Sequence, residues 1–367
     1  MNNKWRIPYS EPYLNEKTRI DLLDAFDASE LSGNGAATRT LESQLSSLLN
    51  ADFGLTVSNG SAALRLAFQT LGLRPGMKVI LPGWGFHVAS NVAHSMGATI
   101  EYIDVDIDSW CMDLDSIEQC IESNNDNFIV LIHTLGNSSH LDKIEKVKKL
   151  SNVHIIEDAA EALFSVYKGS HLGTLFDIGT YSFHAAKTIT TGEGGFITLG
   201  NKKLFEVAKL LRNHGMTPER PYFHHLPGDN FRLSNLLSAI GLSQIENINV
   251  IIEKRKKIYE QYYVELKDSK AKFLMPTDPE GFFPWGVGIR CGKYRDEVIQ
   301  KLQKAGIDSR PGFSSAALLP HFDSAKGNKE LFNSNILASE VVLLPHYPSL
   351  TEEMVSEICE VVSKSLN

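Results

Sequence analysis

Three short segments of the chain carry residue types that could hold and use an aldehyde cofactor. The first, residues 181–195, contains Lys187 and ends in the cluster Gly192-Glu193-Gly194-Gly195. A lysine amine can form a Schiff base with an aldehyde, and glycines let the backbone pass close to a ligand. A lone lysine near glycines is most often exposed to solvent, and no P-loop pattern precedes this one. Its interpretation therefore depends on the other two segments.

The second segment is the acidic pair Glu157-Asp158, which follows an apolar run. We expect both carboxylates just beyond the end of a strand at 154–156, at the sheet edge where open α/β folds bind ligands. A carboxylate there could keep a pyridine nitrogen protonated, so that pyridoxal phosphate (PLP) acts as an electron sink. Alternatively, Asp158 before Ala-Ala-Glu is the N-cap of a helix. Taken alone, the pair favours the cap.

The third segment, residues 57–64, predicts a strand that ends in Asn59-Gly60 and a helix that begins with Ser61. Free amides at a helix N-terminus, the helix dipole and a serine hydroxyl together can bind a phosphate group. The simpler interpretation is a turn followed by a serine cap. The phosphate hypothesis gains weight from the two downstream segments.

The elements that must position these residues alternate between short apolar runs and amphipathic helices. This alternation predicts an α/β fold in which helices cover a mainly parallel sheet. The predicted strands are residues 53–57, 78–81, 99–103, 128–132, 154–156, 178–182 and 196–198. The predicted helices are residues 61–71, 88–95, 144–150 and 204–213.

The second half of the chain predicts a smaller unit. Residues 214–230 are rich in His, Pro and Gly and should form a loop, and residues 234–266 predict a helix pair or one bent helix. Residues 283–291, 296–305 and 352–366 suggest a small sheet with covering helices. We expect a large domain over residues 1–250 and a small C-terminal domain over residues 251–367.

Composition excludes several functional classes. The 367 residues are 43% hydrophobic and 22% charged, which argues against disorder and fibrous repeats. The net charge of −8 gives no reason to expect a nucleic-acid partner. We find no apolar run of the ~18 residues that span a bilayer and no signal-peptide core, so we expect a cytoplasmic protein without a membrane partner. The spacing of the four cysteines predicts neither a metal site nor a disulfide framework.

The order of these segments resembles the DegT/DnrJ/EryC1/StrS family of sugar aminotransferases, which are PLP enzymes of fold type I similar to aspartate aminotransferase. The resemblance implies a large domain with a mostly parallel seven-stranded sheet and a smaller C-terminal α+β domain. The residues after Lys187 look like those of perosamine synthases. The resemblance covers almost the whole chain and is carried by residues 31–35, 40–42, 59–64, 82–91, 157–161, 182–195, 212–215, 230–232, 344–345 and 350–351.

The resemblance implies a role for each matching residue. Lys187 matches the Schiff-base lysine, and Asp158 matches the aspartate that pairs with the pyridine nitrogen. Phe86 aligns with the aromatic residue that stacks on the ring, although its segment alone favours a core phenylalanine. The residues that match phosphate-binding positions are Gly60, Ser61, Ala62 and Ser182.

Other matches concern the substrate and the neighbouring subunit. Asn230 matches a residue that reaches the phosphate from the neighbouring subunit, which implies a homodimer with shared active sites. Glu161 replaces a Gln or His that approaches the phenolic oxygen of the cofactor, where a carboxylate would repel a phenolate unless protonated. His184, His214 and Arg232 are substrate candidates, but a core or surface role fits each histidine equally well.

The implied reaction is transfer of the amino group of L-glutamate to a keto sugar, in the biosynthesis of an amino sugar for lipopolysaccharide, O-antigen or a related glycoside. We expect a nucleotide-linked 4-keto-6-deoxyhexose, and a keto sugar acid is the alternative acceptor. Related 3-dehydratases carry histidine in place of the lysine, so Lys187 disfavours a dehydratase. A non-catalytic binding protein would not need the lysine, the aspartate and the phosphate site together. Thr188 and residues 313–317 depart from the family pattern, which leaves the sugar open.

Overall fold

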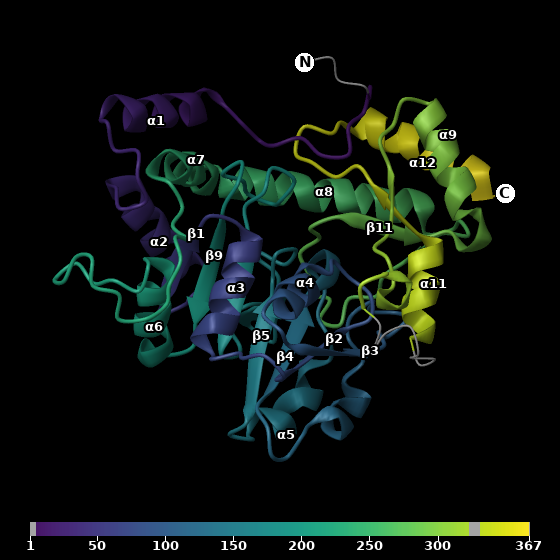
Figure 1. Cartoon of the computed structure of the whole chain (residues 1–367). Coiled ribbons are helices and arrows are strands. Elements are labelled where there is room, and N and C mark those ends of the chain that lie inside the picture. The colour runs from purple at the N-terminus through teal and green to yellow at the C-terminus, as the bar shows by residue number, and fades with distance from the viewer. Residues whose placement is uncertain (1–4, 323–330, 367) are drawn as a thin grey trace.

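The computed structural model describes residues 5–322 and 331–366, and Figure 1 shows their arrangement around a seven-stranded sheet. The strand order is β1-β9-β8-β5-β4-β2-β3. β9 runs antiparallel to both of its neighbours, and the other pairs are parallel. The predicted mostly parallel sheet is therefore confirmed. Its strands are β1 (Gly54–Val57), β2 (Lys78–Pro82), β3 (Thr99–Ile103), β4 (Asn127–Ile132), β5 (Val153–Asp158), β8 (Ile178–Ser182) and β9 (Gly195–Leu199).

Strand β5 is longer than predicted. It continues beyond residue 156 because Leu131 and Ile132 of β4 pair with Glu157 and Asp158. On its other side, β8 pairs with the same two residues. The expectation that both carboxylates lie beyond the strand is wrong, because they are its last two residues. The residues that follow form turns rather than a helix, so the N-cap interpretation of Asp158 is also wrong.

Helices cover both faces of the sheet because its central strands are apolar on both sides. Along β4, Phe128 and Val130 point into one core, whereas Ile129 and Leu131 point into the other, as alternation along a strand requires. The first core contains residues of α3 (Gly60–Thr70), α4 (Val88–Ser95) and α6 (Lys202–Arg212). The second contains residues of α2 (Ala36–Leu48) and of the 3₁₀ helices η1 (Leu114–Cys120) and η3 (Leu141–Ile144). The helix predicted at 144–150 is only the short α5 (Glu145–Lys148).

The first fifty residues contain two helices that we did not predict. α1 (Glu16–Asp27) begins at a capping box in which Asn15 Oδ1 accepts from the Thr18 amide at 3.0 Å. Both α1 and α2 pack against α7 (Asn235–Glu246). Helix α1 leaves Phe26 60% exposed, so its apolar residues do not form one buried stripe.

The predicted helical stretch at 234–266 is a pair of helices, α7 and α8 (Ile248–Leu266), separated at Asn247. α8 leads into a further core built by a four-stranded antiparallel sheet in the order β10-β11-β13-β12. Ile7 packs in this core and pairs with Ile307, so the N-terminal segment crosses to the C-terminal elements (Figure 1). The division near residue 250 stays a prediction. The elements are β10 (Lys272–Phe273), β11 (Val287–Arg290), α9 (Arg295–Lys304), β12 (Arg310–Pro311), α11 (Phe332–Glu340), β13 (Val341–Leu344) and α12 (Glu352–Leu366).

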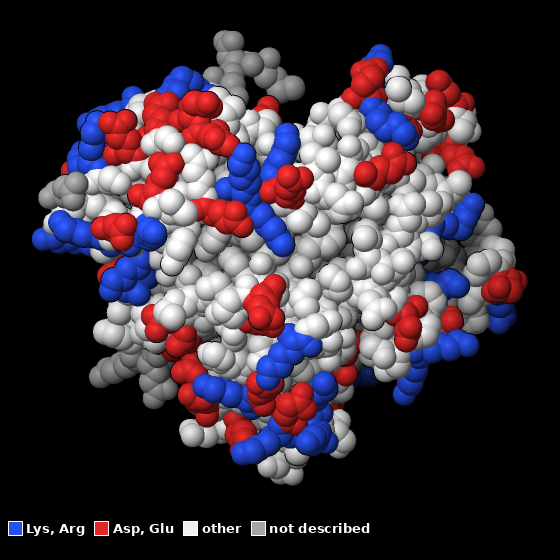
Figure 2. All heavy atoms as spheres, turned by 180° about the vertical axis from the view of Figure 1, so that it is seen from behind, with Lys and Arg blue, Asp and Glu red and all other residues white. Residues whose placement is uncertain are grey.

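Smaller elements and the molecular surface complete the fold. Among the described residues, no helix combines the length and apolarity needed to cross a bilayer. Seen from behind, charged side chains gather in clusters, and a broad area right of centre carries few of them (Figure 2). The short elements are η2 (Thr134–Gly136), β6 (Val166–Tyr167), β7 (Ser170–His171), η4 (Gly292–Tyr294) and η5 (Ala316–Leu318).

Candidate active site

A cavity of about 830 Å³ opens where the parallel strands β5 and β8 end. This is the edge of an open α/β sheet at which ligands bind. The three segments singled out in the sequence meet here, although they lie far apart along the chain. Eight of the predicted site residues line the cavity: Gly60, Ser61, Phe86, Asp158, Glu161, Ser182, His184 and Lys187.

Lys187 belongs to the loop between β8 and β9 and turns its amine into the cavity. Its amide donates to the carbonyl oxygen of His184 at 2.9 Å, which fixes the loop. The amine lies 4.2 Å from the centroid of the Trp285 ring and 3.5 Å from Glu161 Oε1. The side chain is only 13% exposed. The solvated position expected of a lone lysine is therefore wrong here.

Asp158 is a buried carboxylate at the end of β5. Its Oδ1 accepts one hydrogen bond, from the Ala160 amide at 3.2 Å. Burial raises the pKa of Asp158 to about 6, an effect that the charge of Lys187 partly opposes. A positive group facing this carboxylate would favour its charged form, as a protonated pyridine nitrogen would. The residue therefore fits the role of ring-nitrogen partner.

The N-terminus of helix α3 borders the same cavity. Asn59, and not Ser61, is the N-cap, and its Oδ1 accepts from the Ala62 amide at 2.8 Å. The Gly60 and Ser61 amides stand in the first turn, where helical amides have no acceptor within the helix. A Cβ atom on Gly60 would lie 3.0 Å from the Cβ atom of Ser182, so glycine allows this close approach. These groups suit a phosphate, whereas Ala62 does not line the cavity.

Phe86 is a cavity residue and not a core residue. It is 59% exposed, although the residues around it are mostly buried. Its ring centroid lies 6.1 Å from that of Phe313, which also lines the cavity. The core interpretation of Phe86 is therefore wrong, and its free ring face suits stacking on an aromatic cofactor.

The structure does not bring His214, Asn230 and Arg232 to this cavity. Arg232 donates from Nη1 to Asn213 Oδ1 at 2.7 Å and from Nε to Asn230 Oδ1 at 3.0 Å. These residues lie at the base of the loop 214–230, which projects from the side of the molecule (Figure 1). Their roles toward a substrate or a neighbouring subunit stay predictions.

Sequence reasoning missed several residues that line the cavity, because the chain brings them from far away. Phe313 begins the segment 313–317 that departs from the family pattern, and Arg310 stands three residues before it, so this signal could have found them. Trp285 gave no local signal. The missed residues include Tyr9, Glu193, Trp285, Arg310 and Phe313.

A buried arginine, Arg255, binds the backbone of Lys187. Arg255 is 2% exposed and donates to the carbonyl oxygens of Trp285 at 3.0 Å and of Lys187 at 3.4 Å. Burial lowers the pKa of Arg255 to about 10. Burial also lowers the pKa of His346 to about 4, so its neutral ring can accept from Arg255 at Nδ1. Arg255 thus ties the backbone of Lys187 to the segments that carry Trp285 and His346.

Glu157, the neighbour of Asp158, points away from the cavity. Its carboxylate accepts from the amides of Gly173 at 2.7 Å and Leu175 at 2.8 Å. His133 Nε2 lies 3.1 Å from the same group. Because a carboxylate with several donors is already satisfied, Glu157 fixes the turn after β7 and is not a ligand of the site.

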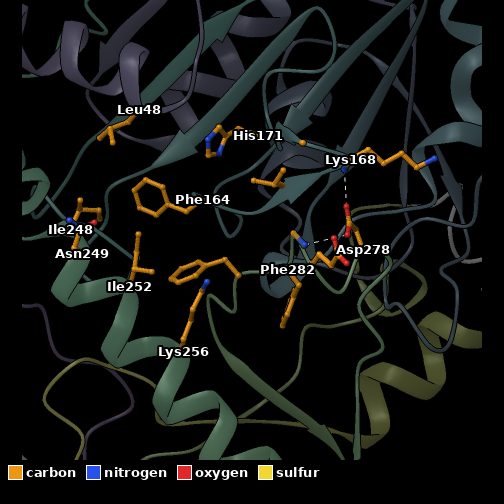
Figure 3. Close-up of a pocket in the computed structure, with 15 residues that line it drawn as sticks. Leu48, Phe164, Lys168, His171, Ile248, Asn249, Ile252, Lys256, Asp278 and Phe282 are labelled. Carbon is orange, nitrogen blue, oxygen red and sulfur yellow. Dashed lines mark hydrogen bonds between the residues drawn. The ribbon is translucent and has the colours of Figure 1, made fainter.

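A second cavity, of about 640 Å³, lies beside the β6–β7 hairpin and the start of α8 (Figure 3). One of its two lining carboxylates, Asp278, accepts from the amides of Lys168 at 2.8 Å and Gly281 at 3.3 Å. The Lys168 amine lies 2.5 Å from Asp142, which does not line the cavity. In residues 5–322 and 331–366, no three His, Cys, Asp or Glu side chains are grouped as metal ligands. The arrangement suited to aldehyde chemistry therefore belongs to the first cavity.

Comparison with known proteins decides the family. The model of the DegT/DnrJ/EryC1/StrS aminotransferase family matches residues 13–363. The chain belongs to this family. The resemblance recognised in the sequence is confirmed, and the chain is a PLP-dependent sugar aminotransferase. Its cavity fits that cofactor, because an amine, a buried carboxylate and a helix N-terminus face one another in it.

Three proteins match this aminotransferase over nearly its whole length. GDP-perosamine synthase of Escherichia coli O157:H7 is 31% identical over 98% of both chains. A putative sugar aminotransferase from Streptococcus pneumoniae, Spr1654, has a TM-score of 0.92 in its apo-form and 25% identity, covering 99% of this chain and 98% of that one. An E. coli GDP-4-keto-6-deoxy-D-mannose-3-dehydratase has a TM-score of 0.88 and 21% identity, covering 98% of this chain and 99% of that one. The fold alone therefore does not separate amino transfer from dehydration.

Proposed function

We propose that this aminotransferase moves the amino group of L-glutamate to a nucleotide-linked 4-keto-6-deoxyhexose, in the biosynthesis of an amino sugar for a surface polysaccharide. The observation that carries the proposal is the amine of Lys187, buried in the same cavity as the Asp158 carboxylate. The similarity to a GDP-perosamine synthase supports a sugar nucleotide as the acceptor, and GDP as its nucleotide.

Each residue of the cavity has a part in this proposal. When bound, PLP supplies an electron sink for the substrate carbon that carries the amino group. Lys187 would hold the cofactor and, once its amine is free again, would move the proton between that carbon and the aldehyde carbon of the cofactor, because it is the only lysine among the described residues of the cavity lining. Asp158 keeps the ring nitrogen protonated, and Phe86 covers one ring face. The phosphate is held by Gly60, Ser61 and Ser182.

The charge of the cavity supports anionic substrates. Arg310 is the only arginine among the described lining residues, and its side chain is 57% exposed. Glutamate carries two carboxylates, and a sugar nucleotide carries a diphosphate. A guanidinium binds either group through paired hydrogen bonds. We assign Arg310 to this contact, in addition to the candidate His184, which also lines the cavity.

We infer that the enzyme works as a homodimer in which Asn230 reaches the cavity of the partner subunit. Helix α1 exposes the apolar side chains of Ile20, Leu23 and Phe26, and Tyr222 on the projecting loop is 91% exposed. Exposed apolar groups of this kind favour a protein interface. The area with few charges in Figure 2 supports the same inference. We also propose the cytoplasm as its compartment, since the buried thiol of Cys111 is unpaired.

The proposal is tested with purified protein and PLP. Glutamate alone should bleach the visible absorbance band of the bound cofactor, because the amino group passes to it. A mass-spectrometric screen should then find an aminated product from GDP-, UDP- or dTDP-linked 4-keto-6-deoxyhexoses. Absence of the glutamate half-reaction would refute the choice of donor. Amination of keto sugar acids alone would refute the nucleotide-linked acceptor, and loss of water without amination would identify a dehydratase.

A further inference from the structure

Glu161 is a second acid of the cavity, and two groups hold its carboxylate in place. Its Oε2 accepts from the Leu135 amide at 3.1 Å, and its Oε1 lies 3.5 Å from the amine of Lys187. The side chain is 7% exposed. Leu135 adopts a left-handed backbone conformation with φ of 53°, which is strained for leucine. Strain of this kind is retained where a site needs a particular geometry, and here it accompanies an amide aimed at Glu161.

The two contacts of the Glu161 carboxylate are with an amide N–H and an amine. An amide donor and an ammonium both stabilise the ionised form, and neither requires a proton on the acid. Asp158 has a different surrounding, because no ion pair joins it to Lys187 among the residues that the structure describes. The two buried acids of the cavity therefore serve different nitrogens. Asp158 suits the ring nitrogen, and Glu161 faces the nitrogen of the lysine.

We propose that Glu161 is a positioning residue, the counter-ion that keeps the Lys187 nitrogen protonated both before and after the cofactor aldehyde is attached to it. The proposal rests on Lys187 being the cofactor lysine, as in the proposed function. The sequence led us to expect repulsion between the Glu161 carboxylate and the phenolate of the cofactor unless Glu161 is protonated. The proposal replaces this expectation. A positive nitrogen close to both groups offsets their repulsion.

The test is a pH titration of the visible absorbance of the PLP-loaded protein, which follows loss of the proton from the lysine-bound nitrogen. Glu161→Gln keeps an oxygen for the Leu135 amide but removes the charge. We expect its midpoint to fall by at least about one pH unit, a tenfold loss of proton affinity. Glu161→Asp keeps the charge and should stay closer to the wild type. Glu193→Gln removes an equal charge from an exposed lining residue and should shift the midpoint far less.

An unchanged midpoint in Glu161→Gln would overturn the proposal, as would an equal shift in Glu193→Gln, which would indicate the general field of the protein. If Glu161→Gln does not fold, Glu161→Asp provides the test. Its shorter side chain places the carboxylate farther from the Lys187 nitrogen, so its midpoint should still fall below that of the wild type. A titration that shifts as expected in a protein that fails to react with glutamate would support the counter-ion and refute glutamate as the donor in the proposed function. The two failures are therefore distinguishable.

Discussion

The guanidinium of Arg310 stacks on the ring of Tyr9, with Cζ 4.3 Å from the ring centroid. Tyr9 comes from the N-terminal segment and Arg310 from β12, so the contact joins distant parts of the chain at the cavity. Asp308, its ion-pair partner among the described residues, is 3.7 Å away and leaves the cation more than half exposed. The ring orients the charge without neutralising it, so Arg310 is ready to bind an anion.

This geometry predicts the effect of removing the cation. Arg310→Ala should raise the KM for the anionic substrates roughly 10- to 100-fold, because a hydrogen bond to a charged group contributes about 1.5–3 kcal/mol. Arg310→Lys keeps the charge but loses the planar fork, so it should recover part of the affinity. Steady-state kinetics with glutamate and the sugar nucleotide varied separately will show which substrate uses the residue. Unchanged KM values for both would contradict the assignment.

We expect the buried carboxylate of Asp158, which the proposed function needs, to lower the stability of the cofactor-free protein. Its pKa is raised from 3.8 to about 6 in the folded state, so the unfolded state binds fewer protons between these values. Stability therefore falls as pH rises through this window. Asp158→Asn removes this cost and should stabilise the cofactor-free protein by about 3 kcal/mol above pH 6, with no gain below about pH 4.

Urea unfolding at several pH values measures this difference. The same variant should lose transaminase activity, because amide oxygen cannot hold the ring nitrogen protonated as a carboxylate does. Two results would contradict this prediction: an Asp158→Asn variant that is less stable than the wild type at pH 8, or a gain in its free energy of unfolding that does not depend on pH. Either would show that ionisation of Asp158 does not destabilise the folded protein.

Subunit mixing tests whether Asn230 serves the cavity of a partner. Lys187→Ala and Asn230→Ala should each lose activity when assayed alone. After they are unfolded and refolded together, half of the dimers are heterodimers in which one of two sites carries neither change, so about a quarter of wild-type activity should return. If both residues serve the same subunit's site, every site keeps one defect. Activity no greater than the sum of the separate variants would then refute the shared site.

The core of the fold was predictable because burial leaves a clear pattern. The central strands β4 and β5 are apolar on both faces, which makes them continuous runs in the sequence. Asp158 and Lys187 were placed correctly in one cavity because Asp158 ends β5 and Lys187 follows the neighbouring parallel strand β8. The end of β5 was misjudged because charged residues normally terminate a buried strand, whereas Glu157 is satisfied there by turn amides.

Other features depend on tertiary contacts that no local pattern records. Helix α1 exposes several apolar side chains in the single chain, so it lacks the clear amphipathic period that would reveal it. Trp285 and Tyr9 reach the cavity only through the packing of the C-terminal elements and the N-terminal segment. The ion pair of Glu161 with Lys187 required coordinates, because the sequence alone suggested a conflict with the cofactor.

The most direct test of the whole account is reduction of the PLP-loaded protein with borohydride, followed by peptide mass spectrometry. Reduction fixes the cofactor to the amine that holds it. We predict a single modified peptide that contains Lys187, and neither modification nor a visible absorbance band in Lys187→Ala. Modification of a different lysine, or a band that survives in Lys187→Ala, would contradict the assignment on which the proposed chemistry depends.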